Sequence, residues 1–108
     1  MSTESWSKKD FHCFLMIYGG TADYNIDDKE VNKIARKYGS DRFLNMLKIF
    51  EGSTEEERLD LIREYKNANY ETLEDFQGAV NKLMQVYMAD GEFSEEEQQQ
   101  LSDLISKV

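Results

Sequence analysis

The sequence contains no proline, one cysteine and one histidine among its 108 residues. Without proline, no residue rigidly interrupts a helix. The single Cys13 cannot form a disulfide within the chain, which agrees with a reducing compartment. His12 is its direct neighbour, and adjacent side chains on a helix point about 100° apart. With no second His or Cys to complete a set of ligands, the pair predicts neither a zinc site nor a catalytic dyad.

Long apolar runs and an excess of positive charge are also missing. No stretch approaches the roughly 20 apolar residues that span a bilayer, and the cluster at residues 14–18 lacks the length and cleavage site of a signal peptide. We therefore expect a cytoplasmic protein without direct membrane insertion. Asp and Glu number 22 against 13 Lys and Arg, a formal charge of −9. This balance argues against nucleic-acid binding and leaves a cation, a basic protein surface or plain solubility.

The signatures of catalysis are absent as well. A Ser-His-Asp set would have to use His12, which nothing marks as a base. Gly19-Gly20 lacks the Lys and Ser/Thr that follow in a phosphate-binding loop. Acidic residues are so numerous that no pair stands out as hydrolytic. We therefore expect that the protein is not an enzyme.

Helix starts are marked by a recurring pattern, in which a Ser, Thr or Asp is followed three residues later by an acid. The cap oxygen accepts an otherwise unpaired backbone N–H, and the acid can reach back to the N–H of the cap. Each such cap contributes about 1 kcal/mol. The pairs are Ser7 with Asp10, Asp27 with Glu30, Thr54 with Glu57, Thr72 with Asp75, and Ser94 with Glu97.

Apolar residues after these caps recur at helical spacing, as in Phe11, Phe14, Leu15 and Tyr18. No sustained strand alternation is present. The sequence therefore predicts an all-α fold: a compact bundle of about six short helices forming a single domain over residues 1–108. We expect the core to include Cys13 and the methionines, and Trp6 to pack down on it. The remaining stripes begin at Val31, Phe43, Leu59, Phe76 and Leu101.

Two segments, residues 22–30 and 89–97, align without a gap. Ala, Asp, an apolar residue, a helix cap, an acid and a Glu recur at matching offsets. An apolar residue follows each Glu four positions later, as Ile34 and Leu101. The chain thus reads as an internal pseudo-repeat: helix, acidic turn, helix, then two middle helices, then helix, acidic turn, helix.

The second segment, Ala-Asp-Gly-x-apolar-Ser-x-x-Glu, is similar to the signature of the TerB-like family, which is associated with tellurite resistance. The resemblance implies an all-helical fold, no established catalytic activity, a divalent-cation site at the acidic turns, and a role in metal or oxyanion stress. Carried over by position, the family's acidic residues are Asp23 and Glu30 in the first turn and Asp90 and Glu97 in the second. Tyr24 stands where the family pattern has glycine, which weakens the match at the first turn.

A cation of the Ca²⁺ or Mg²⁺ type needs several converging oxygens. Residues 23, 25 and 27 match the opening of an EF-hand loop, but Ile34 then falls at its twelfth position. In the second copy, Val86 and Met88 would occupy two ligand positions. Neither segment is an EF-hand. The candidate metal ligands are therefore the acids of the two turns: Asp23, Asp27, Glu30, Asp90 and Glu97.

Local chemistry offers another explanation for the same residues. Glu30 and Glu97 fit capping boxes, and Asp27 fits cap duty. Asp23 and Asp90 can accept hydrogen bonds from their own turns. If the fold brings both turns together, however, their carboxylates repel each other and a cation would relieve the repulsion.

Two hypotheses follow. The first is a non-enzymatic TerB-like stress-response module that binds a divalent cation at the duplicated turns. The second is a metal-free helical domain for protein–protein interaction with an acidic binding face. In either case we expect a protein partner, either basic or membrane-associated.

Overall fold

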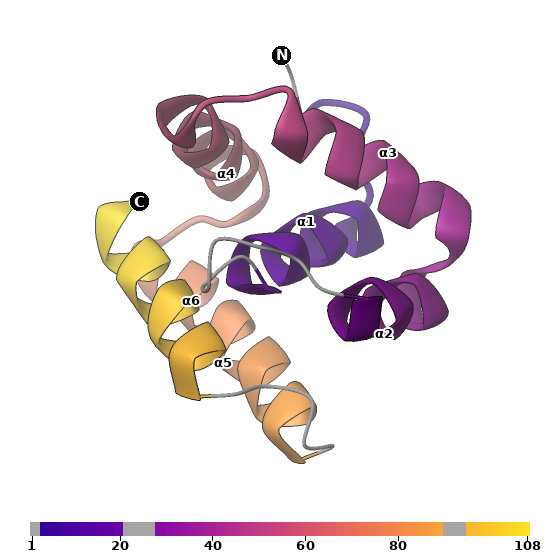
Figure 1. Ribbon diagram of the computed structural model, residues 1–108. Helices are drawn as coiled ribbons and strands as arrows, with labels where there is room; N and C mark the ends of the chain where they lie inside the picture. Colours follow the sequence, from indigo (N-terminus) through magenta and orange to yellow (C-terminus); the bar gives the residue numbers. More distant parts are fainter. Residues whose placement is uncertain (1–2, 21–27, 90–94) are drawn as a thin grey trace.

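Six helices and no strand occupy the part of the chain that the computed structural model describes, residues 3–20, 28–89 and 95–108. The all-α prediction is confirmed (Figure 1). The order along the chain also matches the prediction: a first pair of helices, two middle helices and a last pair. The helices are α1 (Lys8–Gly20), α2 (Asp28–Tyr38), α3 (Ser40–Glu51), α4 (Glu55–Asn69), α5 (Leu73–Ala89) and α6 (Glu95–Lys107).

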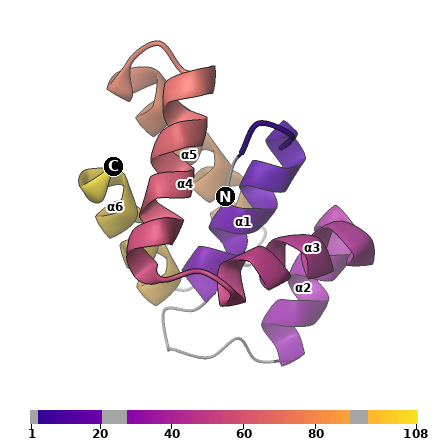
Figure 2. The same ribbon diagram turned by 90° about the horizontal axis from the view of Figure 1, so that it is seen from above.

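Helix α1 lies at the centre of the bundle. Figures 1 and 2 show α2 and α3 on one side of it and α4, α5 and α6 on the other. Phe11 on α1 stacks on Tyr65 of α4, with ring centroids 4.0 Å apart, and also faces Phe76 of α5. Phe14 meets the edge of Phe50 on α3. The central helix therefore contacts the first and second halves of the chain alike.

The burial of α1 extends beyond the predicted stripe. The spacing of its apolar residues predicts an amphipathic helix, yet Cys13, Met16 and Ile17 are as deeply buried as Phe14 and Leu15. A helix that is apolar all round belongs in an interior position. The other five helices are amphipathic, and each turns its apolar side toward α1 or toward a neighbour of α1. Trp6 packs on Phe14 at 5.1 Å, as predicted.

Three of the predicted caps lie among the described residues, and all three are confirmed. Ser7 and Asp10 exchange hydrogen bonds at 2.9 and 3.1 Å, so the shorter Asp side chain closes the same box as a Glu. Thr54 and Glu57 form the full capping box of α4. The hydroxyl of Thr72 accepts a bond from the N–H of Asp75. The pairs that begin at residues 27 and 94 lie outside the described residues.

Charged side chains form ion pairs and hydrogen bonds between the helices at the surface. Arg42 of α3 pairs with Asp10 of α1 at 2.7 Å. The guanidinium of Arg58 donates to the Phe50 carbonyl, at the end of α3, and lies over the Phe50 ring. Arg63 donates to the backbone carbonyl of Lys107 at the end of α6. Arg58 and Arg63 thus donate to carbonyls at the ends of α3 and α6, where the intrahelical hydrogen bonds stop. The Phe50 carbonyl also accepts from the hydroxyl of Ser53.

The bundle has a radius of gyration of 12.8 Å, close to the value of about 13 Å expected for a compact chain of this length. None of the helices in the described part of the chain has the length and apolar character needed to cross a membrane.

The central position of α1 predicts a large difference between two substitutions. We expect Phe14→Ala to lower the free energy of unfolding by about 3–5 kcal/mol, because it leaves a cavity in the core. Leu44→Ala on α3, where the side chain is 59% exposed, should change it by less than about 0.5 kcal/mol. Urea unfolding followed by circular dichroism measures both. Equal effects would contradict the central role of α1.

Candidate functional site

Glu97 is the one predicted metal ligand whose side chain the structure describes. Asp23, Asp27 and Asp90 lie outside the described residues, and Glu30 is placed only as the third backbone position of α2. Glu97 is the third residue of α6, directly after the second acidic turn. The described part of the candidate site therefore consists of Glu97 and the helix ends around it.

The carboxylate of Glu97 is buried. It is the one charged side chain among the described residues that falls in this class, with 7% of its surface exposed. Its neighbours Glu95 and Glu96 on the same helix are exposed. Burying a charge is costly unless a hydrogen-bond donor, an opposite charge or a metal ion compensates. Sequence reasoning found this residue through the repeated turn, but not its burial.

The last turn of α1 contacts the first turns of α6. Gly19 makes this approach close: a Cβ on it would lie 3.5 Å from Cγ of Leu101 and 3.8 Å from the carbonyl oxygen of Glu97. The helix that leads into the first acidic turn therefore touches the helix that follows the second one. Because Asp23 is four residues from Gly19, the chain can bring both turns to the same end of the bundle.

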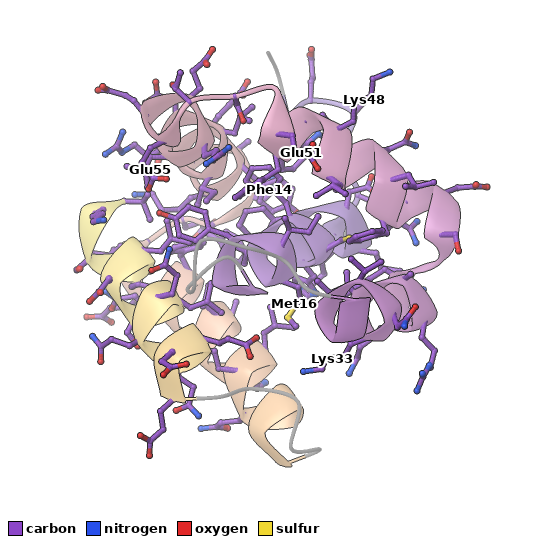
Figure 3. The ribbon with its side chains drawn as sticks, in the orientation of Figure 1. Phe14, Met16, Lys33, Lys48, Glu51 and Glu55 are labelled. Carbon is purple, nitrogen blue, oxygen red and sulfur yellow. The ribbon has the colours of Figure 1, made fainter. Side chains whose placement is uncertain are left out.

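A buried tyrosine adds polar contacts at this end of α1. The hydroxyl of Tyr18 donates a hydrogen bond to Glu55 at the start of α4. Burial, the bond to Glu55 and the nearby charge of Asp103 on α6 all raise the pKa of Tyr18 above its usual range. Figure 3 shows Glu55 on the side of the bundle where α4 and α6 lie. The periodic spacing predicted Tyr18 as a core residue and gave no sign of this polar contact.

No group of three or more metal-ligating side chains occurs within residues whose side chains are described. Four of the five predicted ligands are not among those side chains, so this finding does not test the predicted site. His12 and Cys13 do diverge, as expected of helix neighbours: Cys13 is fully buried, whereas His12 is partly exposed. Comparison of the chain with protein-family models, curated proteins and solved structures finds no match.

The environment of Cys13 predicts a thiol that does not react in the folded protein. Burial raises its pKa to about 12, so almost no thiolate forms near neutral pH, and the thiolate is the reactive form. We expect a disulfide reagent such as DTNB at pH 8 to label the native protein at the rate of unfolding, and the protein in denaturant at once. Rapid labelling of the native protein would contradict this burial.

Proposed function

We propose that this chain is a non-enzymatic TerB-like module that acts by binding, with a divalent cation held between its two acidic turns. The ligands would be Asp23, Asp27, Glu30, Asp90 and Glu97. A hard cation such as Ca²⁺ or Mg²⁺ suits this set of carboxylates, because such ions prefer oxygen ligands. The cellular role that accompanies the resemblance is a response to metal or oxyanion stress, carried out with a protein partner.

The burial of Glu97 is the observation that supports the cation most directly. Exposed acids are common on a chain of charge −9 and carry little information. A carboxylate withdrawn from water in the first turn of a helix is unusual. A cation would offset both the cost of burying it and its repulsion from the acids of the turns.

The contact between Gly19 and the first turn of α6 gives the second line of support. A cation site shared by two turns requires that the turns approach each other. A Cβ on Gly19, in the last turn of α1, would lie 3.8 Å from the carbonyl oxygen of Glu97 in the first turn of α6. The helix ends that adjoin the two turns are therefore close, as a site shared by both turns requires.

A metal-free interaction domain with an acidic face is the second candidate. The carboxylates of Glu56, Glu57 and Asp60 on α4 and of Glu96 and Asp103 on α6 are all exposed. Both helices place an acid near Tyr18, Glu55 by its hydrogen bond and Asp103 by its charge, so the two acidic surfaces adjoin. Such a field attracts a basic partner and speeds its association at low salt.

A substitution at Glu97 separates a metal ligand from a helix cap. Gln can serve at the third position of a capping box as Glu does, but it lacks the charge that a hard cation requires. In calorimetric titrations with Ca²⁺, Mg²⁺ and Mn²⁺, we expect one saturable site in the wild type, with a higher melting temperature when it is occupied. Asp90→Asn with Glu97→Gln should abolish this site while the metal-free protein stays folded.

Glu96→Gln is the matched control, because it removes the same charge from the adjacent exposed position. It should leave cation affinity within about twofold, as expected of an exposed charge. Absence of heat and of any change in melting temperature with all three ions would reject the cation site. Salt-sensitive binding of a basic peptide, lost when Glu56, Asp60 and Asp103 are neutralised, would then support the interaction domain.

A further inference from the structure

An open groove of about 600 Å³ runs between α1 and α5, at a different place from the acidic turns. Its floor is apolar and is formed by Gly78, Ala79 and Leu83 of α5. Gly78 is exposed, and a Cβ on it would have no atom within 4 Å, so the space above this residue is open. The volume lies in the range of about 300–1,000 Å³ in which small ligands bind.

Three nitrogen-bearing side chains line this groove: Lys8 and His12 of α1 and Lys82 of α5. Neither lysine has a carboxylate within ion-pair distance among the described residues. Lys8 is moreover the first residue of α1, where the positive end of the helix dipole disfavours a cation. Two acids, Glu74 and Asp75, also line the groove, but neither lysine is held in an ion pair with them.

The pKa of His12 responds to the charges around it in the groove. It is the one side chain between Phe11 and Tyr18 on the central helix that is not buried, and it faces the groove. Burial and the charge of Lys8 hold its pKa below the usual value. An anion placed beside it would favour the protonated ring and raise that pKa.

We propose that the groove binds an amphipathic carboxylate, whose charged head lies between Lys8, Lys82 and His12 and whose apolar body covers Gly78, Ala79 and Leu83. The two lysines supply charge-assisted hydrogen bonds to the carboxylate. The apolar floor supplies the hydrophobic contact that an inorganic anion could not use.

Glu74 and Asp75 also line the groove, but they do not offer an equivalent site for a cation. Both lie in the first turn of α5, where the positive end of the helix already favours their negative charge. Residue 82 is eight positions further along, about 12 Å at the rise of an α-helix. The acids therefore lie toward one end of the groove, away from Lys82.

Hexanoate is a suitable probe, with hexanol and hexylammonium as matched ligands that share its chain and differ in the head group. Because His12 is the only histidine, its ring Cε1–H resonance can be followed through a pH titration by NMR without ambiguity. We expect hexanoate to raise the pKa of His12 in a saturable way at millimolar concentration, the affinity range for a ligand of this size. Hexanol and hexylammonium should not raise it.

Two variants test the head and body contacts separately. Lys82→Met should weaken hexanoate binding about two- to fivefold through loss of a partly exposed charge contact. Gly78→Leu should abolish binding by filling the groove, and it should fold normally because leucine is a better helix former than glycine. Lys48→Met on α3, where the lysine points away from the bundle (Figure 3), should leave binding unchanged.

The change in the His12 pKa on adding hexanoate must be compared within each variant, with melting temperatures confirming that every variant is folded. An unchanged His12 pKa at saturating hexanoate would overturn the proposal. An equal response to hexylammonium, or an undiminished response in Gly78→Leu, would overturn it as well. None of these readouts involves a divalent cation, so the result is independent of the proposed cation site.

Discussion

The burial of α1 is the constraint on which the rest of the structure depends. A helix of 13 residues has little stability alone in water, and one that is apolar on every side must be covered by others. Phe11 contacts Tyr65 of α4 and Phe76 of α5. Phe14 and Tyr18 both meet the ring of Phe50 on α3. The surrounding helices are consequently arranged around one axis. The central helix reaches the surface at its exposed first residues and at the partly exposed Asp10 and His12.

The helices and their caps could be predicted from the sequence because they depend on local contacts. The central position of α1 could not be predicted in this way. Caps such as Thr54 with Glu57 depend on residues three positions apart, and the stripes on the outer helices depend on residues three and four apart. The position of α1 depends on contacts with the whole chain. The apolar residues between Phe11 and Tyr18 include the predicted stripe and are equally compatible with an interior helix, so periodicity alone does not distinguish the two.

For the candidate cation site, the structure describes the side chain of one predicted ligand, Glu97. The repeat of residues 22–30 at 89–97 identified Glu97 by position, since its offset from the turn matches that of Glu30. Its burial could not be predicted, because burial depends on how the helices pack and not on residues three or four positions apart. Gly19 of α1 lies close to the first turns of α6 in that packing. Sequence reasoning gave Gly19 no role beyond a rejected phosphate loop. A glycine near the end of an apolar helix, in a chain that also has an acidic helix start, indicates where two helices can approach each other closely.

A divalent cation could stabilise so acidic a chain without any specific site, by reducing repulsion among all its surface carboxylates. That effect would act on Glu96 as much as on Glu97, because it depends on charge and not on position. A bound ion would depend on Glu97, which is buried, and not on Glu96, which is exposed. The ion would also act locally, at the end of α1 and the start of α6, which are the helix ends that adjoin the two turns.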